Sequence, residues 1–366
     1  MSQQVEKINA AIQKLRNKDF NVYFFAMDSR GNPVASLNTI YTWGKYLKES
    51  GYNPVILHEK KEYTKPDKWM GSTEYVELDH KSAETKDVNM FPHDFLFIPE
   101  IFSNVMEQTK SMPVKRIALC QSYDYVLEFI KPGESWLNYN ITECVTTCES
   151  QQKYLQYLFP QIKINVVPIS IPEYFKNSDK PKKPVFAIHT RDPRNAMKIM
   201  KTFFLRFPQY RWITFRDLRG LRREEFAKGL KECCIAIWDD KQSGFGTFPL
   251  EAFKTKSILI ASRPTIMPDW YDEKAAVWVN DTVDIADAIG KTFSAWLEDL
   301  LPEDLQNIPG KYEEMYKPEK EKEAFLEYFD KLIESRISEF EVAIKEIESQ
   351  IQTQTPNNPD VINLFE

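Results

Sequence analysis

The sequence contains two series of short apolar runs, and each run is followed by a segment with apolar residues at helical spacing. The first series begins with NVYFFAMD at residues 21–28, and the second begins with VFAIHT at residues 185–190. Continuous apolar runs of this length are typical of strands that are buried on both faces of a parallel sheet. Two series of strand–helix repeats therefore predict an α/β protein with two doubly wound parallel sheets.

A charged, proline-bearing segment, EYFKNSDKPKKP at residues 173–184, separates the two series, and we interpret it as a linker. It divides the chain into two Rossmann-like domains, residues 1–175 with an N-terminal helix over residues 1–18, and residues 176–312. A helical extension with a loose tail follows at 313–366. Such sheets bind ligands at the carboxyl ends of their strands. Two domains that face each other therefore predict a ligand-binding cleft.

The composition excludes several other classes of protein. No apolar run approaches the roughly 20 residues that span a bilayer, and the polar N-terminus differs from a signal peptide, so we expect a cytoplasmic protein. The 5 cysteines include no CxxC pair, and the 4 histidines have no zinc-like spacing. We therefore expect no bound metal and no cofactor. The net charge of −6 disfavours general nucleic-acid binding, although arginines cluster over residues 206–223.

Two loops of the second series place arginines after predicted strands. HTRDPRN carries Arg191 and Arg194 directly before a helix, and RDLRG carries Arg216 and Arg219. A helix N-terminus favours anions, and guanidinium groups bind phosphate oxygens in a bidentate manner. Each loop alone is also compatible with solvated surface arginines.

A third loop, SGFGTFPLEAF, combines glycines with a carboxylate at the start of a helix. Gly244 and Gly246 permit a close backbone approach to a ligand, Pro249 suits a first helical turn, and Glu251 follows on that turn. A plain tight turn is the alternative for this loop alone. Three such loops at neighbouring strand ends together predict a nucleoside-diphosphate site, in which cations and amides bind the phosphates and a carboxylate accepts hydrogen bonds from the ribose.

The third loop and its flanks resemble a known family signature. SGFGTFPLEAFKTKSILIAS resembles EGFGxxxLEAMAxGxPVIAS of the GT-B glycosyltransferases of the family-4 type, and HTRDPRNAMKIMKTF resembles their GRLxxxKGxxxLLxAF segment. The resemblance covers most of residues 185–290. It implies the GT-B fold and transfer of a sugar from a donor such as a UDP- or GDP-sugar, with retention of configuration and without a metal.

The resemblance also implies roles for individual residues. Glu251 would bind the ribose of the donor, and Arg191 and Arg194 would bind its diphosphate. Together with Arg216, the residues expected to line the donor are Ser243, Gly244, Phe245, Gly246 and Thr247. Arg191 and Glu251 are also expected to take part in catalysis.

Two departures from the signature affect sugar recognition. Ser243 stands where the family has a glutamate near the donor sugar, and SRPTIMPDWYDE replaces the paired glycines after the next strand. Because of these changes, the sequence does not identify the donor sugar. They also keep a non-catalytic nucleotide-sugar-binding scaffold as an alternative.

In the first series, two loops are expected to contact the acceptor. SRGNPVAS supplies Gly31 and Asn32, and QSYDY supplies Gln121, Tyr123 and Asp124. Asp124 would act catalytically by orienting the acceptor hydroxyl, or would only cap the next helix. For the first loop, a plain strand–helix turn is an equal alternative.

The leading hypothesis is therefore an enzyme that transfers a sugar to a hydroxyl of a saccharide or another acceptor. A second hypothesis within the same fold is a phage-encoded enzyme that glycosylates hydroxymethylated bases of DNA in the host cytoplasm. Steeply salt-dependent binding to duplex DNA would support this second hypothesis.

Overall fold

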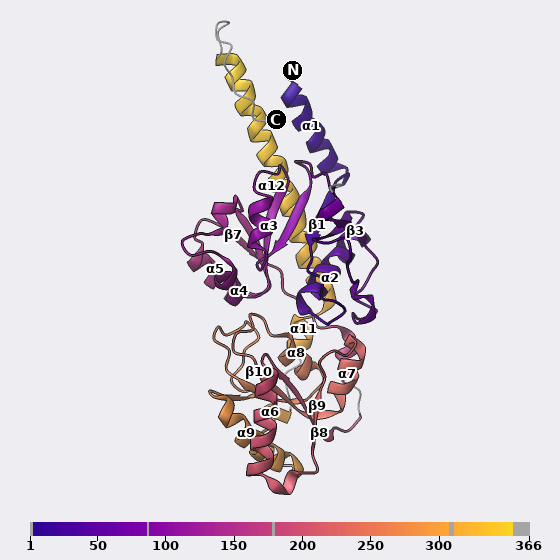
Figure 1. Ribbon diagram of the computed structural model, residues 1–366, viewed down its shortest axis with the longest axis vertical. Coiled ribbons are helices and arrows are strands. Elements are labelled where there is room, and N and C mark those ends of the chain that lie inside the picture. Colours follow the sequence, from indigo (N-terminus) through magenta and orange to yellow (C-terminus); the bar gives the residue numbers. More distant parts are fainter. Residues whose placement is uncertain (1–2, 86–87, 178–179, 307–310, 354–366) are drawn as a thin grey trace.

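The computed structural model describes residues 3–85, 88–177, 180–306 and 311–353, and it consists of two lobes, one above the other in Figure 1. The predicted loose tail, from residue 354 on, lies outside the described residues. Each lobe contains one sheet, and every strand pair in both sheets is parallel. The predicted α/β class with two parallel sheets is confirmed.

The sheet of the N-terminal half has the strand order β3-β2-β1-β4-β5-β6-β7. Its strands are β1 (Asn21–Phe25), β2 (Asn53–His58), β3 (Asp79–Ser82), β4 (Phe95–Pro99), β5 (Lys115–Cys120), β6 (Glu143–Thr146) and β7 (Lys163–Val166). Its helices are α1 (Gln3–Arg16), α2 (Ala35–Glu49), α3 (Ser103–Gln108), α4 (Tyr123–Phe129) and α5 (Glu149–Leu158). The short edge strand β3 was not expected, because its sequence DHKS is polar; it lies at the edge of the sheet and is only partly buried.

The sheet of the C-terminal half has the order β12-β11-β10-β8-β9. Its strands are β8 (Lys183–Thr190), β9 (Thr214–Asp217), β10 (Cys233–Asp239), β11 (Ile258–Ser262) and β12 (Val277–Val279). The helices of this half are α6 (Pro193–Arg206), α7 (Arg223–Glu232), α8 (Thr247–Lys254), α9 (Thr282–Leu297), α10 (Glu303–Gln306) and α11 (Lys311–Met315). Every residue of the central strand β10 is buried, as expected for a strand that is covered on both faces.

The long helix α12 (Pro318–Thr353) starts between the lobes and runs back along the N-terminal lobe, where it lies beside α1 (Figure 1). Phe325 stacks on Trp43 at 4.5 Å, and Trp43 Nε1 donates a hydrogen bond to Glu321 Oε1 at 3.0 Å. Phe325 and Phe329 are fully buried in the core of the N-terminal half. The predicted C-terminal helical extension is therefore packed into that core rather than set apart from it.

Within the described ranges, no helix is long and apolar enough to cross a membrane.

Candidate functional site

One cleft of about 920 Å³ lies between the two halves of the chain, and residues of both halves line it. We define its charged wall by residues of the C-terminal half: His189, Arg191, Arg219, Arg223, Asp240, Ser243, Gly244, Phe245, Gly246, Thr247 and Glu251. We define its hydroxyl wall by residues of the N-terminal half: Ser36, Thr39, Thr42, Gln121, Ser122 and Tyr125.

The three loops of the charged wall follow adjacent strands. In the sheet, β8 lies between β9 and β10, so the loops that leave the carboxyl ends of these three strands lie side by side. The predicted HTRDPRN, RDLRG and SGFGTF loops are therefore brought together at one edge of the sheet, where parallel α/β sheets bind their ligands.

Arg191 is held at the cleft by partners from both halves. Its Nε donates to Asp240 Oδ1 at 2.8 Å, and its Nη1 donates to the hydroxyl of Tyr125, across the cleft, at 3.3 Å. Burial lowers the pKa of Arg191, but the hydrogen bond and charge of Asp240 outweigh it and hold the pKa above its usual value. Arg191 is thus a fixed cation that retains further N–H donors for an anion.

The structure places the other predicted arginines differently. The side chain of Arg194 is 83% exposed and is paired with Asp192 at 2.8 Å, outside the cleft lining. Arg216 donates to Glu232 at 3.0 Å, and it borders a separate shallow depression. Arg219 lines the cleft and is paired with Asp217. Both Arg194 and Arg216 have their guanidinium groups satisfied by acidic neighbours of their own half, so neither extends into the cleft.

The glycine loop fits closely against tryptophan rings. Gly246 has a φ of +72°, and a Cβ there would lie 3.0 Å from Trp238 Cζ2 and 3.3 Å from Trp270 Cζ2. A Cβ on Gly244 would lie 2.8 Å from the side chain of Gln151 of α5. Trp270 Nε1 donates to the carbonyl of Phe245 at 2.6 Å. Gly246 is therefore favoured by its left-handed backbone and by its close packing on the rings, whereas a Cβ at Gly244 would have to displace the amide end of Gln151.

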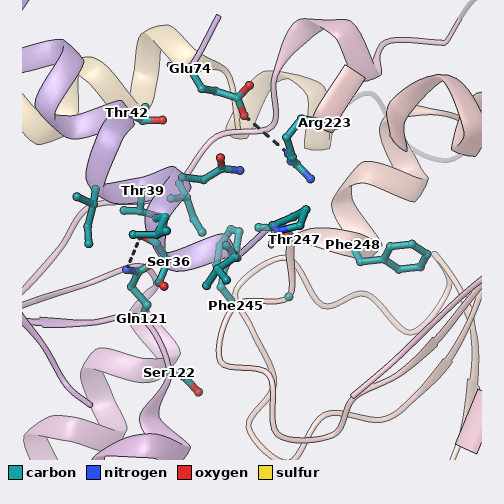
Figure 2. A pocket seen from close by; sticks show the side chains of 18 of the residues that line it. Ser36, Thr39, Thr42, Glu74, Gln121, Ser122, Arg223, Phe245, Thr247 and Phe248 are labelled. Atoms are coloured by element: carbon teal, nitrogen blue, oxygen red, sulfur yellow. Dashed lines mark hydrogen bonds and ion pairs between the residues drawn. The ribbon is translucent and has the colours of Figure 1, made fainter. Parts of the chain in front are cut away.

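Glu251 lies on α8 in the charged wall and is only 1% exposed. Its Oε1 accepts from Arg223 Nη2 at 2.6 Å, and Arg223 Nε lies 3.8 Å from Oε1 of Glu74, which belongs to the segment between β2 and β3 (Figure 2). Burial lowers the pKa of Arg223, but the negative charges of Glu251 and Glu74 raise it by more than burial lowers it. The net shift is upward, so the guanidinium stays charged. Arg223 belongs to the arginine cluster of residues 206–223, but it was not predicted as a site residue.

His189 also lines the charged wall, where its ring stacks on Phe248 at 5.1 Å. Burial lowers the pKa of His189, which keeps its imidazole neutral near pH 7. His189 was not predicted as a site residue, because a single histidine before an arginine loop carries no distinctive pattern.

One face of α2 supplies half of the hydroxyl wall (Figure 2). Ser36, Thr39 and Thr42 follow one another at three-residue spacing, which places them on one side of a helix, and Gln121 Nε2 donates to the carbonyl of Ser36 at 3.3 Å. Gln121 was expected to face the acceptor, whereas the three hydroxyl residues were not predicted from the sequence. The only signal for them was their spacing within SLNTIYT at residues 36–42.

A buried acid, Glu100, holds the backbone of the hydroxyl wall by a hydrogen bond to Ser122. Oε1 of Glu100, after β4, accepts from the backbone N–H of Ser122 at 2.8 Å, and both residues line the cleft. Burial raises the pKa of Glu100 to about 7, while backbone hydrogen bonds oppose this shift.

Four predicted acceptor or catalytic residues lie outside the cleft lining: Gly31, Asn32, Tyr123 and Asp124. Asn32 Nδ2 donates to the carbonyl of Ser29 at 3.0 Å and Gly31 has a φ of +79°, so this loop has the geometry of the alternative, plain turn. Tyr123 is buried against Tyr154 at 5.2 Å, and Asp124 lies in the first turn of α4. Helical geometry turns Tyr125, rather than these two residues, to the cleft.

In the part of the chain that the structure describes, no group of three or more His, Cys, Asp or Glu residues is arranged to hold a metal ion.

Comparisons with known proteins agree with this geometry. No protein-family model matches the chain. An α-1,6-glucosyltransferase of Actinobacillus pleuropneumoniae is 25% identical over 242 residues, which cover 64% of this chain and 70% of the relative. The HepE protein of Anabaena, solved with UDP and glucose, aligns with a TM-score of 0.62 at 8% identity, over 85% of this chain and 99% of its own.

Two further solved structures share the architecture. A glycosyltransferase of Rickettsia africae has a TM-score of 0.60 at 14% identity, over 86% of this chain and 98% of its own. A sucrose-phosphate synthase of Thermosynechococcus elongatus has a TM-score of 0.59 at 12% identity, over 86% and 99% of the two chains. The fold is that of the GT-B glycosyltransferases. The chain is an enzyme of the glycosyltransferase class.

Proposed function

We propose that the chain transfers a hexose from a nucleoside-diphosphate sugar, foremost a UDP-sugar, to a hydroxyl of a saccharide acceptor. The observation that carries the proposal is the convergence of Arg191, the Gly244–Gly246 backbone and Glu251 in one cleft between two parallel sheets. The similar α-1,6-glucosyltransferase and the UDP-containing HepE structure support a glucosyl donor and a uridine nucleotide.

On the charged wall, Arg191 would bind the diphosphate through its Nη groups, and the glycine loop would lie along the phosphates and the sugar. Glu251 would accept hydrogen bonds from the ribose, with Arg223 holding its carboxylate in place. As the bond between the sugar and the β-phosphate breaks, negative charge develops on the diphosphate. A fixed cation at that position stabilises the charge in the transition state, which is electrostatic catalysis.

On the hydroxyl wall, the acceptor would be positioned by Ser36, Thr39, Thr42 and Gln121. Neutral hydroxyl and amide groups can both donate to and accept from sugar hydroxyls. A duplex DNA acceptor is less well matched, because neutralising its phosphates takes several lysines and arginines, whereas the N-terminal half, among its described residues, contributes Lys45 as its one basic lining residue, beside Glu74, Glu100 and Glu128. The resemblance to the family-4 type adds retention of configuration and independence of metal to the proposal.

The proposal is tested by a thermal-shift panel of nucleoside diphosphates and sugar nucleotides, with and without EDTA. A ligand that binds only the folded chain raises the unfolding temperature by mass action. We expect UDP and UDP-glucose to stabilise the chain, and EDTA to leave the effect unchanged. Slow hydrolysis of the stabilising sugar nucleotide would then separate an active enzyme from a scaffold that only binds. No stabilisation by any member of the panel would refute the proposal.

A further inference from the structure

Asp240, which follows β10, is the carboxylate nearest to the cation that we assign to the diphosphate. Its side chain is 12% exposed and lines the cleft, and its Oδ1 accepts from Arg191 Nε at 2.8 Å and from the backbone N–H of Gln242 at 3.2 Å. Arg191 is its one ion-pair partner among the described residues. Asp240 therefore both holds the guanidinium and places a negative charge beside it.

The preceding residue, Asp239, shows that this arrangement is specific to Asp240. Asp239 is buried and points into its own half, where it accepts from Ser262 Oγ at 2.6 Å, from Asn195 Nδ2 at 3.2 Å and from Thr282 Oγ1 at 3.3 Å. It is satisfied by neutral donors that tie β10 to its neighbours. Two consecutive aspartates thus differ completely: one is structural, and the other faces the cleft with a cation.

The position of Asp240 makes the binding of an anion depend on the charge of that anion. Because Arg191 uses Nε for Asp240, its Nη groups remain for phosphate oxygens. An anion bound there interacts favourably with Arg191 and unfavourably with Asp240, a few ångströms away. The repulsion grows with each negative charge on the anion, since the Coulomb energy is proportional to both charges.

Glycosyl transfer changes that charge. When the bond between the anomeric carbon and the β-phosphate oxygen breaks, the bonding electron pair stays on that oxygen. The acceptor oxygen forms the new bond to the anomeric carbon, and its proton passes to solvent. Above the second pKa of a phosphate monoester, about 6, the nucleoside diphosphate therefore carries one more negative charge than the intact donor.

We propose that Asp240 is a positioning residue that makes the cleft discriminate between donor and product: it fixes Arg191 through Nε and weakens binding of the nucleoside diphosphate more than binding of the sugar nucleotide. Product release is thereby favoured after each transfer. The inference rests on the proposed function of the same cleft.

The test uses the full chain at pH 8 and low salt, with Asp240→Asn as the main variant. Asparagine keeps an acceptor for Arg191 Nε but removes the charge. The control, Asp192→Asn, removes the charge of an aspartate paired with an exposed arginine outside the cleft and keeps a good helix N-cap. Dissociation constants of UDP and UDP-glucose are measured by calorimetry, or those of GDP and GDP-mannose if the panel selects guanosine.

In Asp240→Asn, we expect the dissociation constant of UDP to fall about three- to tenfold, and that of UDP-glucose to fall clearly less. The ratio of the two constants should stay unchanged in Asp192→Asn. Product inhibition of donor hydrolysis by UDP should strengthen in parallel in Asp240→Asn, a change that a purely structural role would not produce. The inference would be overturned if the ratio of the dissociation constants of UDP and UDP-glucose in Asp240→Asn equalled that of the wild type.

Failure of the underlying assignment gives a different result. If Arg191→Ala binds UDP and UDP-glucose as tightly as the wild type, the diphosphate is not at Arg191, and the proposed site itself is wrong. If Arg191→Ala loses UDP but Asp240→Asn leaves the ratio unchanged, only the role of Asp240 is refuted.

Discussion

The two walls of the cleft are built in different ways. The charged wall comes from loops at three adjacent strand ends, and its cation Arg191 is fixed by a carboxylate and a tyrosine. The hydroxyl wall combines one face of α2, which presents Ser36, Thr39 and Thr42, with the segment that follows β5. Under the proposed function, the difference teaches that a diphosphate is bound by converging loops with arginine and glycine, whereas a neutral acceptor is met by uncharged hydroxyl and amide side chains.

The largest effect is expected for Arg191→Ala, which removes the central cation of the charged wall. Loss of one preorganised electrostatic donor typically lowers turnover by about 10²- to 10³-fold. Stability should fall by about 1 kcal/mol or less, because the Arg191 side chain is 33% exposed and its pair with Asp240 is partly screened. Donor hydrolysis measures the loss of turnover, and thermal unfolding measures the loss of stability. A loss of turnover that is accompanied by a large fall in the unfolding temperature would show that Arg191 is structural.

The next effect concerns Glu100, the buried acid that supports the hydroxyl wall. Burial raises its pKa from 4.5 to about 7 in the folded chain. Below pH 4.5 the carboxyl is protonated in both states. Between pH 4.5 and about 7 it ionises in the unfolded chain but stays largely protonated in the fold, so the free energy of unfolding falls as the pH rises and levels off above 7. The full difference, at about 1.4 kcal/mol per pKa unit, is on the order of 3 kcal/mol.

Chemical denaturation of the wild type and of Glu100→Gln between pH 4.5 and 8 checks this linkage. The variant should gain stability relative to the wild type as the pH rises, because glutamine cannot ionise. If the free energy of unfolding changed with pH in the same way for both proteins, the raised pKa of Glu100 would be contradicted.

Gly246→Ala tests the packing of the glycine loop. A left-handed backbone costs a non-glycine residue about 1–2 kcal/mol, and the new Cβ would also press on Trp238 at 3.0 Å. The matched control is Gly51→Ala, where φ is +81° but no atom lies within 4 Å of the added Cβ. We expect Gly246→Ala to lose more stability than the control and to weaken donor binding, which the control should leave unchanged. Equal losses in the two variants would show that the rings yield to the added methyl group.

The charged wall was largely predictable from sequence because its chemistry is local. Apolar runs gave the strands of the parallel sheets, and arginines and glycines directly after those runs marked the loops that converge. Which arginines reach the cleft was not predictable. Arg194 is engaged by Asp192 at the start of α6, and Arg216 of β9 is engaged by Glu232 at the end of α7. Such pairing depends on side-chain geometry that the sequence pattern does not show.

The hydroxyl wall was less predictable, because Ser and Thr at helical spacing occur on many helices. The expected loop residues Gly31 and Asn32 form a turn, while Tyr125, two residues past a predicted position, reaches across to Arg191. The pairing of Glu74 with Arg223 joins residues 149 positions apart, and no local pattern announces such a contact. Long-range ion pairs form, and particular helical residues come to face the cleft, only when the two halves of the chain pack together.

Thr39→Val tests the hydroxyl wall alone. Valine keeps the shape of threonine and removes one hydroxyl, and a neutral hydrogen bond is worth about 0.5–1.5 kcal/mol. We expect the acceptor KM to rise about two- to tenfold, while the dissociation constant of the donor stays unchanged. Thr292→Val, on α9 outside the cleft lining, is the control that reports any general effect of the exchange. A change in donor affinity for Thr39→Val alone would show that the two walls are not separate in function.

The smallest effect is expected for Arg194→Ala, which separates the two arginines of the HTRDPRN loop. Its side chain is 83% exposed and paired with Asp192, and such solvent-screened pairs contribute little. We expect less than a twofold change in UDP affinity, against at least a tenfold loss for Arg191→Ala in the same titration. A similar loss in both variants would mean that Arg194 leaves Asp192 when the diphosphate binds. The charged wall would then be completed by its ligand, and the contrast with the hydroxyl wall would be one of ligand-induced order as well as of charge.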